Sequence, residues 1–143
     1  MSKVFFIFLL VFFTIFSCKD TDTDKERINA VCDKFMKTFS EGNFSNAIQS
    51  LKKNSVMTHS TIDTLDAKVQ TQMHAALESY GYGNILGYEF INEGTVKNFI
   101  AKRYYILKFK KYYLKFDFTL YNSGNEWTIT NFTFNDGLLE ILR

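Results

Sequence analysis

Side chains that could do acid–base, nucleophilic or metal chemistry are few in this chain of 143 residues, and they form no motif. The two histidines, His59 and His74, do not have the spacing of paired metal ligands, and no cysteine lies close to either in sequence. A catalytic site needs a nucleophile, a base and a group that orients the base, and at most one of these is recognisable. We therefore expect no metal, no cofactor, and binding or assembly rather than catalysis.

The composition indicates one folded domain of ordinary charge. Hydrophobic residues make up 46% and aromatic residues 17% of the chain, which is enough apolar surface to offset the entropy of ordering the backbone. The formal net charge is +2, and removal of Lys3 with an N-terminal leader lowers it by one. Lysines and tyrosines do alternate between residues 102 and 115, but lysines also discourage pairing at sheet edges. We expect no nucleic-acid partner.

The N-terminus has the pattern of an export signal. Lys3 precedes a run from Val4 to Phe16 whose one polar member is Thr14. As a helix this run rises only about 20 Å, less than the roughly 30 Å hydrocarbon core of a bilayer, so an export signal is favoured over a spanning helix.

The residues that follow this run predict a lipid anchor. Ile15-Phe16-Ser17-Cys18 resembles the lipobox of bacterial lipoproteins, in which the cysteine becomes the N-terminus and carries acyl chains. This resemblance implies that residues 1–17 are a signal peptide and that Cys18 is the lipid attachment site. It places the protein in the bacterial cell envelope, at the outer membrane or cell surface, with the membrane as its first partner. Residues 18–25 then form a solvated tether and residues 26–143 a single domain.

Apolar spacing predicts three helices in the first half of the chain. A continuous helical stripe runs through Ile28, Val31, Cys32, Phe35, Met36 and Phe39, with a capping box at Thr23 and Glu26. Cys32 lies within this stripe, so we expect a buried thiol. Asn43 caps a second helix that carries Phe44 to Leu51, and Ser60 or Thr61 caps a third that carries Ile62 to Tyr80.

Aromatic and β-branched residues predict an antiparallel meander after Asn84. The expected strands are 85–92 and 95–98, separated by a turn or bulge at Glu93-Gly94, then 100–109, 112–121 and 127–134. The apolar residues of the last strand change parity between Ile129 and Phe132. Either one bulge near Thr130-Asn131 returns them to one face, or both faces of the strand are covered. An apolar tail from Leu138 to Leu142 either closes over the core or meets a second subunit.

This order of elements is that of an α+β fold, with N-terminal helices packed on a strongly curved antiparallel β-sheet. It resembles the NTF2-like superfamily, a cone in which helices close over a bent sheet. The resemblance rests on the helical stripe that ends at Phe39, the junction Glu41-Gly42-Asn43-Phe44, and the closing strand Trp127-Thr128-Ile129. Enzymes, transport factors and exported proteins share this fold, so the fold alone does not assign a function.

The resemblance directs attention to residues that a cone would enclose. Its enzymes hold a carboxylate or histidine inside the cone as a general base, and the candidates here are His59, Glu89 and Asp117. Trp127 is a further candidate for the lining of the cavity. Asp117 shares a strand face with Lys115 and Thr119, so a solvent-facing ion pair is the simpler interpretation, and Glu89 and His59 equally suit the surface.

Three functions fit this sequence. The first is a membrane-anchored binding or assembly module whose cavity takes a small apolar or amphipathic ligand, or whose surface takes a protein partner. The second is an isomerase or hydratase-like activity in the same cavity. In the third, phenylalanine and tyrosine side chains fill the cone and the outer sheet face forms a homodimer.

Overall fold

The computed structural model describes residues 21–138, and the predicted export signal, Cys18 and the end of the apolar tail lie outside this range. Three helices precede four strands: α1 (Thr21–Ser40), α2 (Phe44–Ser50), α3 (His59–His74), β1 (Ile85–Val96), β2 (Ile100–Phe109), β3 (Tyr113–Asn122) and β4 (Trp127–Asn135). A short 3₁₀ turn, Leu51–Lys53, follows α2, and a π-helical turn, Ala75–Ser79, continues α3. The predicted α+β class is confirmed.

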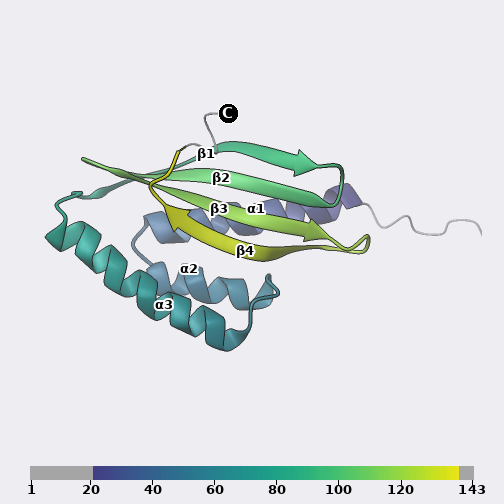
Figure 1. Ribbon diagram of the computed structural model, residues 1–143, viewed down its shortest axis with the longest axis horizontal. Coiled ribbons are helices and arrows are strands. Elements are labelled where there is room, and N and C mark those ends of the chain that lie inside the picture. Colours follow the sequence, from purple (N-terminus) through teal and green to yellow (C-terminus); the bar gives the residue numbers. More distant parts are fainter. Residues whose placement is uncertain (1–20, 139–143) are drawn as a thin grey trace, which may run out of the picture.

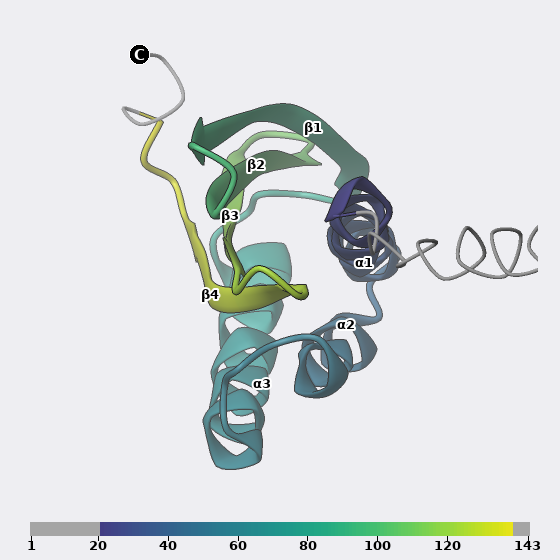
Figure 2. The same cartoon turned by 90° about the vertical axis from the view of Figure 1, so that its right-hand side faces the viewer.

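The strands form one antiparallel sheet in the order β1-β2-β3-β4. Helix α1 lies along one face of this sheet, and the sheet curves around it from β1 to β4 (Figure 2). Helix α2 packs beside α1, α3 packs beside α2, and both extend past the edge strand β4 (Figure 1). We expected all three helices to cover the sheet, but α1 alone lies across its inner face.

The predicted stripe on α1 is the centre of the core. Ile28, Cys32, Phe35, Met36 and Phe39 are each 0–1% exposed and face the sheet. Burial raises the pKa of the Cys32 thiol to about 12, so this cysteine is a packed apolar side chain and not a reactive thiol. After Ser40 the chain turns at Gly42, whose φ of 85° lies in the left-handed region that glycine adopts without strain.

Helix α1 begins at Thr21, earlier than the sequence indicates. Residues 21–25, which we expected to form a solvated tether, are part of the helix. The carboxylate of Asp24 accepts a hydrogen bond from the backbone N–H of Trp127 and pairs with Arg27, whose Nη2 donates to the carbonyl of Trp127 at 3.0 Å. These contacts hold the first turn of the helix against the start of β4.

The other boundaries differ from the predictions in detail. Thr58 caps α3 by accepting a bond from the backbone N–H of Thr61 at 3.2 Å, so this helix begins before the predicted cap at Ser60 or Thr61. The first two predicted strands are one continuous strand, β1, and the turn or bulge predicted at Glu93-Gly94 is instead a register shift between Phe90 and Asn92.

The bulge predicted in the last strand is confirmed. Thr119 pairs with Asn131 and Leu120 pairs with Ile129, so Thr130 is the extra residue of β4. The insertion brings both apolar pairs of β4 to the inner face, where Trp127, Ile129 and Phe132 are at most 6% exposed. The free hydrogen-bonding edge of β4 is covered in part by the segment after α2, because the backbone N–H of Val56 donates to the carbonyl of Ile129 at 3.0 Å.

Candidate functional site

The sequence candidates occupy separate parts of the fold. His59 is the exposed first residue of α3. Glu89 lies on the outer face of β1, the face away from α1, where its exposed carboxylate pairs with the ammonium of Lys108. Neither side chain points into the space between the helices and the sheet, so neither is placed to act as a general base there.

Asp117 lies on the outer face of β3, but it is buried. Its carboxylate accepts a bond from Thr133 Oγ1 at 2.7 Å and lies 3.5 Å from Lys102 Nζ and 3.8 Å from Lys115 Nζ. Asp117 and Lys115 are each 2% exposed. The solvent-facing ion pair expected at this position is therefore an ion pair within a buried polar cluster.

Trp127 holds α1 on the sheet. Its side chain is 6% exposed, and the ammonium of Lys25 lies 4.6 Å from the centre of its ring. Its backbone N–H and carbonyl are both bound by the first turn of α1. These contacts give Trp127 a structural role in holding α1, so its position needs no ligand to explain it.

A second polar network, centred on the buried Arg103 and partly open to solvent at Asp33, joins α1 to the inner face of the sheet. Arg103 on β2 donates from Nε to the hydroxyl of Tyr105 (2.9 Å), from Nη1 to Glu93 (2.9 Å) and from Nη2 to Asp33 (3.3 Å). The hydroxyl of Tyr105 in turn donates to Asp33 at 2.5 Å, and Lys25 donates to Glu93 at 2.9 Å. Each nitrogen of the guanidinium has a partner in this network.

Arg103 and Tyr105 have a structural role in this network and are not placed to exchange protons as an acid–base pair. Burial raises the pKa of the Tyr105 phenol above its ordinary value, and its hydrogen bond to Asp33 raises it further. Burial lowers the pKa of Arg103, but the hydrogen bonds to Tyr105 and Glu93 more than offset this, and the net shift is upward. Tyr105 and Arg103 therefore both keep their protons at neutral pH, and their donors are already used.

Aromatic rings fill the space between α1 and the sheet. Phe35 and Phe39 on α1 pack against Phe118 and Phe116 on β3, with ring centroids 5.2 and 4.9 Å apart. Phe132 on β4 closes the cluster at 5.0 Å from Phe35. These side chains occupy the interior in which the superfamily resemblance places a ligand.

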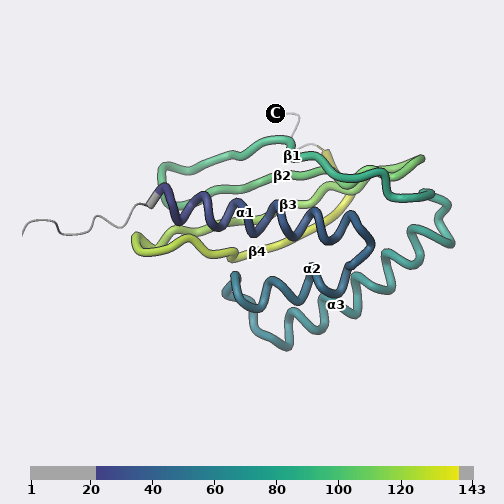
Figure 3. Tube along the Cα trace, turned by 180° about the vertical axis from the view of Figure 1, so that it is seen from behind, coloured from purple at the N-terminus to yellow at the C-terminus, as the bar shows by residue number. Residues whose placement is uncertain are grey.

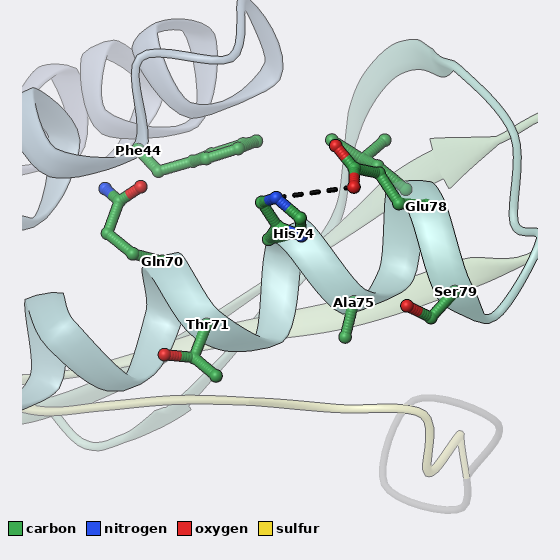
Figure 4. A pocket seen from close by; sticks show the side chains of 8 residues that line it. Phe44, Gln70, Thr71, His74, Ala75, Glu78 and Ser79 are labelled. Atoms are coloured by element: carbon green, nitrogen blue, oxygen red, sulfur yellow. Dashed lines mark ion pairs between the residues drawn. The ribbon is translucent and has the colours of Figure 1, made fainter.

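A groove outside this interior runs between the start of α2 and the end of α3, as Figure 4 shows. This groove is open to solvent and has a volume of about 660 Å³, and small-molecule sites typically have volumes of roughly 300–1,000 Å³. Its floor and walls are partly apolar and partly polar, and they are formed by Phe44, Gln70, Thr71, His74, Ala75, Leu77, Glu78 and Ser79.

The π-helical turn shapes one side of this groove. Tyr80 donates its backbone N–H to the carbonyl of Ala75 at 2.8 Å, one residue further back than in an α-helix. Wide turns of this kind occur often at functional sites in other proteins. His74 just before the turn and Glu78 within it form an ion pair at 3.3 Å along this side of the groove.

Two classes of site are absent from the described residues. Within residues 21–138, histidine, cysteine and carboxylate side chains do not gather in groups of three that could hold a metal ion. In the same part of the chain, every helix is too short or too polar to cross a bilayer.

The chain matches no protein-family model, no curated protein and no solved structure. Its function is therefore inferred from its own side chains.

The sequence interpretation missed both the network and the groove. Arg103 lies within the stretch of lysines and tyrosines from residue 102 to 115, but it has the strand parity of Ala101, Tyr105 and Leu107, which are all buried. That parity was the available signal for a buried cation. The groove is lined by Phe44 on α2 and by residues 70–79 at the end of α3, and no local sequence pattern predicts that these two segments lie together.

Proposed function

We propose that this protein is a lipid-anchored component of the bacterial cell envelope whose single NTF2-like domain binds a small amphipathic ligand. The leader pattern and Cys18 support the anchor, and the curved sheet around α1 supports the NTF2-like assignment. The groove of about 660 Å³ between α2 and α3 carries the binding proposal.

The composition of the groove suits an amphipathic molecule. Phe44, Ala75 and Leu77 offer apolar surface to a hydrocarbon or ring. His74 and Glu78 are about two-thirds exposed at its mouth, where they can donate to or accept from a polar head. The filled interior favours this external site over a ligand inside the cone.

The anchor is tested by the mass of the protein extracted from membranes of a bacterium that expresses the full chain. We expect an N-terminus at Cys18 that is blocked and carries acyl chains, because more than one chain makes the attachment stable. The Cys18→Ala variant is the control, and it should remain unacylated and leave the membrane fraction. A free amino terminus at another residue would refute the anchor.

The binding site is tested by mass analysis of small molecules that co-purify with the native protein. We expect an amphipathic compound whose retention is reduced in the Ala75→Trp variant, because Ala75 is part of the groove lining and an indole there takes up part of its volume. Ala67→Trp, the same change at an exposed position earlier on α3, should retain the compound. Equal retention by both variants, or no compound with any of the proteins, would contradict binding in this groove.

A further inference from the structure

Four apolar residues form a tip at one end of the sheet. Val96, Phe99 and Tyr121 are 55%, 38% and 44% exposed, and Ile100 is partly exposed. Val96 pairs with Ile100 and Ile100 pairs with Tyr121, so three of the four side chains form a row across β1, β2 and β3 on the outer face. Neighbouring apolar side chains left in solvent in this way mark an interaction surface.

This apolar tip lies at the end of the domain where α1 begins. The turns that join β1 to β2 and β3 to β4 both lie beside the first turn of α1 (Figures 1 and 3). The ion pair of Lys25 with Glu93, at 2.9 Å, and the bond between Trp127 and Asp24 fix the helix at this end. The start of the helix therefore has a defined position next to the tip.

The chain leaves little distance between this end and the predicted lipid. Only Lys19 and Asp20 separate Cys18 from Thr21, and each residue step spans at most about 3.6 Å, so the attachment point lies within about 11 Å of the helix. Acyl chains on Cys18 would thus hold this end of the domain against the bilayer surface.

We propose that the apolar tip contacts the bilayer at the boundary between headgroups and acyl chains, an inference that rests on the proposed lipid anchor. Tyr121 suits this boundary because its ring is apolar and its hydroxyl is polar, and Phe99 and Val96 supply apolar area. Lys97, in the turn between Val96 and Phe99, is exposed and offers an ammonium to lipid phosphates.

The size of the tip favours a membrane over a second copy of the chain. Stable protein interfaces use about 20–30 residues on each side, and four side chains fall far short of this. Contact with a bilayer needs no such area, because the acyl chains already hold the domain at the surface.

The test uses the full acylated protein with one fluorescent label, an environment-sensitive NBD group on Asn98→Cys within the β1–β2 turn. Tyr80→Cys is the matched control, at a 65% exposed position in the opposite end of the domain. Acylation blocks Cys18 and burial protects Cys32, so each variant carries one reactive thiol. On vesicles of phosphatidylethanolamine and phosphatidylglycerol with spin-labelled lipid, we expect quenching at position 98 at least about three times that at position 80.

A second substitution separates the tip from the anchor. In the Asn98→Cys background, Phe99→Asp should reduce quenching to the level of position 80 while the protein still floats with the vesicles. Equal, weak quenching at both positions on vesicle-bound protein would overturn the tip contact and leave the anchor standing. Protein that stays in solution with a free Cys18 thiol would overturn both. A blue shift of the NBD emission at position 98 without vesicles, together with a doubled molecular mass of the protein in solution, would show that the tip binds a second copy of the chain instead.

Discussion

Replacement of Phe118 by alanine is expected to lower the free energy of unfolding by about 4 kcal/mol. Phe118 is fully buried on β3, and its ring lies 5.2 Å from Phe35, 5.1 Å from Phe132 and 5.8 Å from Tyr105. The alanine leaves a cavity that these neighbours from α1, β2 and β4 cannot close. Since small domains are stable by only about 5–15 kcal/mol, urea unfolding should show a large loss.

Two further variants fix the interpretation of this result. Phe118→Leu keeps most of the volume and should cost about 1 kcal/mol. Phe99→Ala, the same deletion at the exposed tip, should change stability by no more than about 0.5 kcal/mol. A loss below about 2 kcal/mol for Phe118→Ala would show that the ring cluster is loosely packed, and an open interior would again be a candidate for the ligand site.

Arg103→Met is expected to lower the free energy of unfolding by about 3 kcal/mol, although methionine matches much of the arginine stem. The change removes the guanidinium that joins Asp33 on α1 to Glu93 and Tyr105 on the sheet. Glu93 keeps Lys25, and Asp33 keeps the hydroxyl of Tyr105, so the loss should stay below that of a fully orphaned charge.

Lys108→Met is the matched control for this variant. Lys108 lies on the same strand, β2, but its partner is the exposed Glu89 on the outer face. Exposed pairs contribute about 0–1 kcal/mol, so this variant should unfold almost as the parent does in urea. Equal, small losses in both variants would mean that the network around Arg103 adds nothing to the attachment of α1.

Periodicity predicted the parts of this fold that depend on burial alone. The stripe on α1 was identified correctly because each residue there lies either in the core or in solvent, and its apolar or polar type decides which. The bulge in β4 was predictable for the same reason, since Trp127 and Phe132 must both reach the core and only an extra residue allows it.

Features that depend on distant partners could not be predicted in this way. Residues 21–25 are polar, which predicted a tether. They are helical because the Asp24 carboxylate accepts a hydrogen bond from the backbone N–H of Trp127, 103 residues further along the chain. Arg103 is buried because Asp33, Glu93 and Tyr105 converge on it from three elements. The groove likewise exists only where the end of α3 passes Phe44.

The length of α1 sets the distance between the proposed membrane anchor and the proposed binding groove. The helix has 20 residues and therefore spans about 30 Å between its first residue and the turn that leads to Phe44. If Cys18 carries the proposed lipid, α1 acts as a rigid spacer that holds the groove in the surrounding solution, away from the lipid headgroups. A ligand in the aqueous compartment could then reach the groove while the domain stays attached to the membrane.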